Sequence, residues 1–295
     1  MSLTNAEKLQ LLHSIPGASA VWTRLNCGKP EIVVTVDTTT HDAKAARPQA
    51  FHSLPITYHP SKPFHSMELR HPTSVSDCYN EPIPGGVQIQ PAGANWVGTL
   101  GAACQFRDAV GNRRWGILSN WHVMVSDPPC PTCKIHQPST QYPPIAQLSR
   151  WKEINWVSPN YFDAALADAK IDGLHTITPY IRYIGRPDPV IAQPAVGMNV
   201  CKVGRTTDTT CGQCIAIDAA VTVSYERATA TFLDQALFAS DPGSFSAPGD
   251  SGSLILAVPR FQPVALLFAG NAEFTIGSPV AAIADYFGLS FQFPN

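Results

Sequence analysis

The stretch Pro248-Gly249-Asp250-Ser251-Gly252-Ser253 places a serine between two glycines, directly before the apolar run Leu254-Ile255-Leu256. Glycine tolerates positive φ and lets other groups approach the main chain closely, so this pattern is typical of a tight turn whose N–H groups converge on one point. Such N–H groups can stabilise negative charge on a substrate oxygen. The alternative is an ordinary Gly/Ser/Asp turn at the end of a strand. A base and an orienting carboxylate elsewhere in the chain would favour a nucleophile at Ser251.

The sequence around this turn predicts a mainly β domain over residues 83–295. From Pro84-Gly85-Gly86 onward, short apolar runs alternate with turn residues, which is typical of a β-barrel or sandwich. Only residues 280–287, after Ser278-Pro279, show a helical pattern. The expected strands are 97–106, 115–118, 146–151, 162–167, 198–204, 214–223, 228–233, 252–258, 264–270 and 274–279.

Residues 1–82 have a different texture and are predicted to form a small α+β unit with a linker. A short helix is expected over 4–15 and a hairpin over 18–36, with its loop at Asn26-Cys27-Gly28-Lys29-Pro30. Residues 38–82 are rich in Pro, His, Ser and Thr, and only 51–58 resembles a strand.

Composition narrows the possible partners. The chain has 295 residues, of which 44% are hydrophobic and 14% charged, and a net charge of −2. This describes a globular protein with a sizeable core and no general attraction to nucleic acid or acidic membranes. Residues 1–10 do not resemble a signal peptide, and prolines and Arg260 interrupt the apolar stretch 254–270. A cytoplasmic protein with no membrane or nucleic-acid partner is therefore expected.

His122 and Asp163 are the candidates for the base and the carboxylate. His122 follows the apolar run Gly116-Ile117-Leu118 at the point where a strand would end and a turn would begin. Asp163 precedes the small apolar run Ala164-Ala165-Leu166-Ala167, where burial of its charge would require a partner. Taken alone, each residue could be an ordinary hydrogen-bonded or solvated side chain.

The order His122, Asp163, Ser251 is that of chymotrypsin-type catalytic triads and differs from the subtilisin and α/β-hydrolase orders. In this interpretation Ser251 Oγ attacks a carbonyl, His122 transfers the proton as general base and acid, and Asp163 orients the imidazole. The N–H groups of Gly249 and Ser251 would form the oxyanion hole.

The chain resembles the trypsin/chymotrypsin-like serine peptidases at three motifs: Leu118 to Val123, Asp163 to Ala167, and Gly249 to Ser253. The likeness is closer to a bacterial intracellular branch related to the plant NARROW LEAF 1 proteins than to digestive enzymes. It rests further on Lys202-Val203-Gly204-Arg205-Thr206-Thr207, on Phe245 to Ser253 and on Leu266 to Gly270. The resemblance covers roughly 84–290.

This resemblance implies a chymotrypsin-like double β-barrel with the site between the barrels, and peptide-bond hydrolysis without a cofactor. It places Phe268, Ala269 and Gly270 along the substrate, and Phe245 where trypsin-like enzymes carry an aspartate. A small or medium apolar side chain is therefore expected on the acyl side of the scissile bond. No sequence before residue 97 resembles a processing site, so activation by N-terminal cleavage is not expected.

The eight cysteines include two C-x-x-C pairs, Cys130/Cys133 and Cys211/Cys214. Four thiolates satisfy a tetrahedral zinc ion, so the two loops would hold a structural zinc if they met in space, with His136 as a substitute ligand. Redox-active pairs and unbound thiols are the alternatives. Permanent disulfides are not expected in a reducing compartment, and Cys104 and Cys201 are interpreted as core residues.

The leading prediction is a serine endopeptidase that acts on a restricted intracellular protein, and assembly as a homo-oligomer is left open. Two alternatives stay open: a catalytically idle peptidase fold that serves as a scaffold or binding module, and an acyl hydrolase for small esters.

Overall fold

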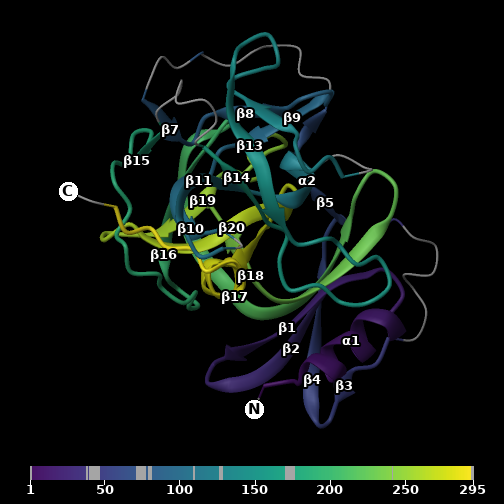
Figure 1. The fold of residues 1–295 in the computed structure, drawn as a ribbon. Coiled ribbons are helices and arrows are strands. Elements are labelled where there is room, and N and C mark those ends of the chain that lie inside the picture. Colours follow the sequence, from purple (N-terminus) through teal and green to yellow (C-terminus); the bar gives the residue numbers. More distant parts are fainter. Residues whose placement is uncertain are drawn as a thin grey trace.

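Two β-sheets make up most of the molecule, with a smaller two-stranded sheet beside them (Figure 1). The structure is a computed structural model. It describes residues 2–37, 39, 47–70, 78, 82–108, 110–125, 129–169, 177–240 and 242–293. The linker predicted within 38–82 lies partly outside these described residues.

The second half of the chain forms a closed six-stranded barrel. Its strands follow the order β16-β19-β20-β21-β18-β17, and a further β16–β17 pairing closes the ring. Closure leaves no free sheet edge in this ring. The strands are β16 (Asn199–Gly204), β17 (Asp208–Ser224), β18 (Thr229–Ala239), β19 (Leu254–Ala257), β20 (Gln262–Gly270) and β21 (Thr275–Pro279).

The first half of the predicted β domain forms an eight-stranded sheet with the order β10-β11-β14-β13-β12-β8-β9-β6. Beside it, β7 (Ile83–Gly85) and β15 (Ile177–Ile181) form a parallel pair. The eight strands are β6 (Leu69–Arg70), β8 (Gln88–Pro91), β9 (Trp96–Thr99), β10 (Ala102–Arg107), β11 (Arg113–Ser119), β12 (Lys134–His136), β13 (Pro144–Trp151) and β14 (Ala165–Asp168).

The N-terminal unit is built as the sequence predicts, from a capped helix and a hairpin. In α1 (Asn5–Ser14) the N-cap Thr4 and Glu7 form a reciprocal capping box, which satisfies two of the first N–H groups of the helix. The other elements are β1 (Ala18–Asn26), β2 (Lys29–Val36), β3 (Ala50–Phe51) and β4 (Leu54–Pro60). This unit occupies the lower part of Figure 1.

One continuous sheet joins the N-terminal unit to the second barrel. Strand β17 extends beyond the barrel and pairs with β1, with Ala20 opposite Val221. Leu11 and Val34 share a buried cluster with Ala220 and Leu233 of the barrel strands. The N-terminal unit is therefore anchored to the barrel by backbone pairing and by apolar packing.

A short strand that the sequence does not predict, β5 (Phe64–Ser66), follows this unit. It pairs in parallel with β17 and antiparallel with β20, where Ser66 lies opposite Ala269. Three residues after the end of β5, β6 begins and pairs with β9 of the first sheet. The segment 64–70 thus crosses from one sheet to the other, along the boundary where the triad candidates lie.

The C-terminal helix α3 (Val280–Phe287) confirms the helical pattern expected at 280–287. Val280, Ile283 and Phe287 are buried with Leu118 and Leu254, so the helix seals the junction between the two sheets. Mainly β architecture, a double barrel and a preceding small α+β unit are thus as expected.

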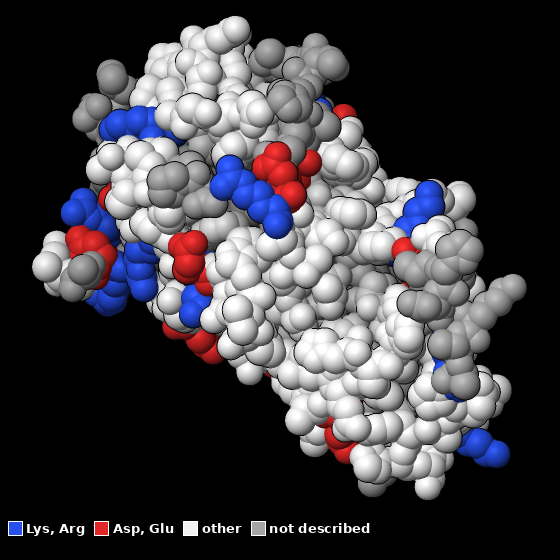
Figure 2. Space-filling view, turned by 90° about the vertical axis from the view of Figure 1, so that its right-hand side faces the viewer, with Lys and Arg blue, Asp and Glu red and all other residues white. Residues whose placement is uncertain are grey.

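Charged side chains do not concentrate on the face shown in Figure 2, where blue and red groups are scattered over a mostly uncharged surface. Among the described residues, no helix is both long and apolar enough to cross a membrane.

Candidate active site

His122 lies on a single-turn helix, α2 (Trp121–Met124), that begins where β11 ends. The preceding Asn120 is fully buried, and its Nδ2 donates a hydrogen bond to the Asp163 carbonyl at 2.8 Å. This bond ties the turn before the histidine to the segment that enters β14. The local fold therefore fixes the distance between His122 and Asp163.

The three predicted residues come together in one hydrogen-bonded series. His122 Nδ1 lies 2.6 Å from Asp163 Oδ2, and His122 Nε2 lies 2.8 Å from Ser251 Oγ. Asp163 and Ser251 are fully buried, and His122 is 6% exposed. Because an ionised carboxylate only accepts hydrogen bonds, the chemistry assigns the imidazole proton to Nδ1 and leaves Nε2 to accept from the serine hydroxyl.

Tyr225 is a third partner of Asp163 that the sequence analysis missed. Its hydroxyl donates to Asp163 Oδ2 at 2.8 Å, and its ring makes an edge contact with the His122 ring. Burial, and then the negative charge of Asp163, raise the pKa of Tyr225 well above its usual value. The phenol therefore stays protonated and helps to stabilise the buried carboxylate.

The turn around Ser251 has the geometry that its glycines predict. Gly249 and Gly252 have φ values of 104° and 95°, a region that L-residues rarely adopt. A side chain at Gly252 would collide with the Thr99 carbonyl and the Ser119 hydroxyl. The N–H groups of Gly249 and Ser251 converge on one acceptor, the backbone carbonyl of Met67, at 2.5 and 3.4 Å. These are the two donors predicted for an oxyanion hole.

A buried ion pair between Lys202 and Asp250 stabilises the turn that contains Ser251. Lys202 Nζ lies 3.2 Å from Asp250 Oδ2, and both side chains are fully buried. Burial lowers the pKa of Lys202, and the charge of Asp250 opposes this effect. Asp250 also accepts hydrogen bonds from the N–H groups of Thr206, Thr207 and Ala247 and from the Thr207 hydroxyl, at 2.8, 3.2, 3.1 and 2.6 Å.

This network gives a structural role to the Lys-x-Gly-Arg-Thr-Thr motif, to which the sequence analysis assigned none. Arg205 N–H donates to Thr99 Oγ1 at 3.0 Å, and Thr99 Oγ1 donates to the Gly249 carbonyl at 2.9 Å. The motif therefore holds the two residues directly before Ser251, Gly249 and Asp250, in place. The sequence does carry a signal for this role, because Lys202 lies in an apolar strand and a buried lysine needs a carboxylate as its partner.

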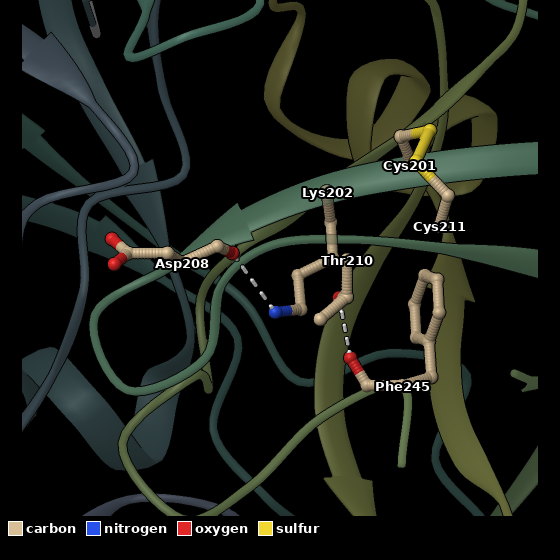
Figure 3. Close-up of a disulfide and its surroundings, with 6 residues drawn as sticks. All are labelled: Cys201, Lys202, Asp208, Thr210, Cys211 and Phe245. Carbon is tan, nitrogen blue, oxygen red and sulfur yellow. Dashed lines mark hydrogen bonds between the residues drawn. A yellow bond between two sulfur atoms is a disulfide. The ribbon is translucent and has the colours of Figure 1, made fainter. Parts of the chain in front are cut away.

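The cysteines differ from the prediction. Cys201 and Cys211 form a disulfide across the β16–β17 hairpin, next to Lys202 (Figure 3). The two residues are direct partners in the strand register, with Cα atoms 4.0 Å apart. Cys104 and Cys201 are both buried, as expected for core residues, but the expectation that the cysteines form no permanent disulfide is wrong for Cys201 and Cys211.

The disulfide also corrects the zinc hypothesis. Cys211 has no thiolate to offer while it is bonded to Cys201, and buried Cys214 donates its thiol to the Ala216 carbonyl. Hydrogen bonding from Cys133 lowers the pKa of Cys130, but these two residues bring only two ligands. Within the described part of the chain, no group of three or more His, Cys, Asp or Glu side chains is placed to hold a metal ion. The site expected at Cys130, Cys133, Cys211 and Cys214 is not formed.

Phe245 lies in the floor of the second barrel, close to the predicted substrate strand. Its ring stacks on Phe238 with centroids 6.0 Å apart, and its carbonyl accepts a hydrogen bond from Thr210 Oγ1 at 2.6 Å (Figure 3). Lys202 Nζ lies 6.0 Å from the ring centroid but is paired with Asp250. Position 245 therefore contributes a buried aromatic ring and no carboxylate.

Phe268, Ala269 and Gly270 form the end of β20 that borders Ser251. The Phe268 carbonyl is 3.2 Å from Ser251 Oγ. Ala269 and Gly270 present their backbone to β5. Beside His122, a cavity of about 340 Å³ remains open, and its lining includes Glu68, Trp96, Trp121, Trp156 and Tyr225.

Comparison with known proteins identifies the fold. No protein-family model matches the chain, and no curated protein sequence matches it. Among solved structures, the chain is similar to the chymotrypsin of Cellulomonas bogoriensis, with 20% identity over 72% of this chain and 99% of that one, at a TM-score of 0.50. It is also similar to protease A of Thermobifida fusca, with 20% identity over 70% of this chain and 97% of that one, again at 0.50.

These likenesses confirm a chymotrypsin-like fold among bacterial serine-protease structures. The relation to the NARROW LEAF 1 branch stays a prediction, as does the division of the chain at residue 82.

Proposed function

We propose that this chain is a serine endopeptidase that uses His122, Asp163 and Ser251 as its catalytic triad. The observation that carries the proposal is the buried series from Asp163 Oδ2 through both ring nitrogens of His122 to Ser251 Oγ, at 2.6 and 2.8 Å. Two backbone N–H groups converge beside the same serine. The nucleophile Ser251, the base His122, the orienting carboxylate of Asp163 and two oxyanion donors thus lie together in one site.

The proposed reaction follows from these positions. Ser251 Oγ attacks a peptide carbonyl while His122 Nε2 takes the hydroxyl proton, and the oxyanion is bound by the N–H groups of Gly249 and Ser251. His122 then gives the proton to the leaving amine as the C–N bond breaks, which leaves an acyl ester on Ser251. Water attacks this ester with His122 as base again and releases the carboxylate. Asp163 stabilises the imidazolium in both halves of the reaction.

Two further observations favour a polypeptide over a small ester as substrate. The end of β20 pairs through its backbone with the extended strand β5 of the same chain, so this edge accepts an extended peptide, which is a common mode of peptide recognition. The names of the two similar structures describe a chymotrypsin and a protease. The apolar floor at Phe245 supports a small or medium apolar side chain on the acyl side of the scissile bond. A restricted intracellular protein remains the proposed substrate class.

A catalytically idle scaffold is the alternative function. Such a protein has no need for an imidazole hydrogen-bonded between a carboxylate and a serine, or for two N–H groups aimed at one point. The retained geometry therefore favours the enzyme.

Hydrolysis of an unstructured peptide library and of matched p-nitrophenyl esters by the purified chain tests the proposal. We expect internal peptide bonds to be cut by the wild type, and the rate to fall by at least about 10³-fold in Ser251→Ala. Ser240→Ala, at a surface serine, is the control and should keep the wild-type rate. Equal cleavage by wild type and Ser251→Ala would overturn the proposal, and hydrolysis of esters alone would favour the acyl hydrolase.

A further inference from the structure

Residues 64–68 run through the candidate active site, and the first three of them form the strand β5. Ser66 is opposite Ala269 and His65 is opposite Gly270 in antiparallel pairing with the end of β20. The Met67 N–H donates to the Phe268 carbonyl at 3.2 Å. The chain therefore runs along the strand that the proposed function assigns to substrate, and it reaches Ser251 at Met67.

The Met67 carbonyl is the acceptor on which the two oxyanion donors converge. Gly249 N–H donates to it at 2.5 Å, and Ser251 N–H points to it at 3.4 Å. This is the position that the carbonyl oxygen of a scissile bond must occupy for Ser251 to attack it. The Met67 carbonyl carbon thus lies beside a serine whose hydroxyl is hydrogen-bonded to His122.

The Met67 side chain fills a pocket in the second barrel. It is 5% exposed and belongs to the same buried cluster as Phe245. Its sulfur accepts a hydrogen bond from Ser246 Oγ at 3.3 Å. A Cβ added at Gly270 would lie 2.7 Å from Met67 Cε, so the missing side chain at Gly270 leaves the room that Met67 occupies.

The chain is also held on the other side of the Met67–Glu68 bond. A Glu68 carboxylate oxygen lies 3.6 Å from His122 Nε2. Leu69 and Arg70 then pair with Val97 and Trp96 of β9. Backbone pairing on both sides positions this one peptide bond at Ser251.

We propose that the chain is its own substrate and that Ser251 cleaves the Met67–Glu68 bond of the same molecule. The proposal rests on the proposed endopeptidase function and names its first substrate. Ser251 Oγ bonds to the Met67 carbonyl carbon, and His122 passes the hydroxyl proton to the Glu68 nitrogen as the C–N bond breaks. Water then hydrolyses the Met67 ester, which leaves a carboxylate at Met67 and a new amino terminus at Glu68.

Cleavage would not release the N-terminal unit. Fragment 1–67 keeps its pairing of β1 with β17 and of β5 with β17 and β20, together with the buried contacts of α1. The two fragments should therefore remain associated until they are denatured. Before cleavage, the same segment occupies the site and excludes other polypeptides from it. After cleavage, only the three-residue strand β5 and Met67 hold the new carboxyl terminus there, so an external peptide can displace it.

Intact mass and N-terminal sequencing of the purified full chain, after denaturation, test the proposal. In the wild type we expect fragments that end at Met67 and begin at Glu68, and co-elution of both fragments under native conditions. The Ser251→Ala chain should stay intact. Because the reaction is intramolecular, its rate should not change with protein concentration. Wild-type enzyme should also leave added Ser251→Ala chain uncut at Met67.

A methionine-containing external peptide separates failure of this proposal from failure of the proposed function. The assay uses the wild type and Met67→Asp, which places a charge where the apolar pocket excludes it. Exposed Leu25→Asp is the control substitution, and circular dichroism checks the fold. If either chain hydrolyses the peptide while wild-type Met67–Glu68 stays intact, self-cleavage is overturned and the peptidase stands. If neither folded chain hydrolyses it and no self-cleavage occurs, both proposals are overturned.

Discussion

Lys202 and Asp250 form an ion pair in which both side chains are fully buried, directly beneath the turn that carries Ser251. Asp250 is the residue before the serine, so the position of its carboxylate constrains the N–H groups of Gly249 and Ser251. A buried pair adds little net stability by itself, but loss of one partner leaves an uncompensated charge. The pair therefore serves mainly to hold the oxyanion donors in place.

Lys202→Met should lower the free energy of unfolding by about 3–5 kcal/mol, because it leaves Asp250 buried without its cation. Urea unfolding measures this change. Arg260→Met is the matched control, because Arg260 pairs with Asp188 at the same 3.2 Å distance but is 69% exposed. The control should change stability by less than about 1 kcal/mol. Similar losses in the two variants would contradict a special role for the buried pair.

Tyr225 should make folding stability depend on alkaline pH. Its pKa is raised in the folded state, so the stabilisation is fully present below the unfolded pKa of about 10 and is lost as pH rises above that value. Tyr225→Phe should therefore lose less stability between about pH 9 and pH 11 than the wild type. Urea unfolding across this range gives the comparison, and ultraviolet phenolate absorbance follows the ionisation. Parallel stability curves for the two proteins would contradict a raised pKa of Tyr225, and with it the burial of this phenol beside Asp163.

The Cys201–Cys211 disulfide should stabilise the hairpin that contains Lys202. It closes a loop with a sequence separation of 10, so replacement of both cysteines by serine should cost about 2–3 kcal/mol. Alkylation of the denatured chain should modify six cysteines without reductant and all eight after reduction. Cys27→Ser, at an exposed position, should leave stability unchanged. Eight alkylated cysteines without reductant would show that the bond does not form.

Gly270 should control the size of the side chain that the pocket accepts. Gly270→Ala and Gly270→Val place carbon atoms where Met67 Cε lies. We expect the ratio of kcat/KM for peptides with Met against Ala on the acyl side of the scissile bond to fall in the order wild type, Ala variant, Val variant. A missing methylene in an apolar pocket changes such ratios by about 10–200-fold. An unchanged ratio would place the pocket elsewhere.

The triad candidates could be predicted from sequence because each lies at a strand end with an unusual polar residue, and because their order matches one known mechanism. Hydrogen bonds of 2.6 and 2.8 Å join them in the structure. The capped helix α1 and the first hairpin were predicted for a similar reason, since their signals are local. Tyr225 carries no such signal, because its partner Asp163 is brought to it only by the closed barrel.

The sequence predicts a linker at 64–68, because a strand of three residues bordered by proline shows no periodicity. Its partners Ala269 and Gly270 lie some two hundred positions away, at the end of β20.

The disulfide between Cys201 and Cys211 is missed from the sequence for another reason. The hairpin between β16 and β17 places Gly204 opposite Asp208, and this register puts Cys201 opposite Cys211. The strands expected from sequence, 198–204 and 214–223, leave a longer loop and do not place Cys201 opposite Cys211. The two C-x-x-C motifs favour a zinc site instead.

Covalent labelling of Ser251 by a fluorophosphonate tests the central claim most directly, because the probe reacts only with an activated nucleophile. The wild type and Met67→Asp are both treated with the probe, and peptide mapping locates the adduct. We predict one adduct per chain, on Ser251, in at least one of the two proteins and its loss in His122→Ala. Absence of an adduct in both folded proteins, or an adduct on a different residue, would contradict the account.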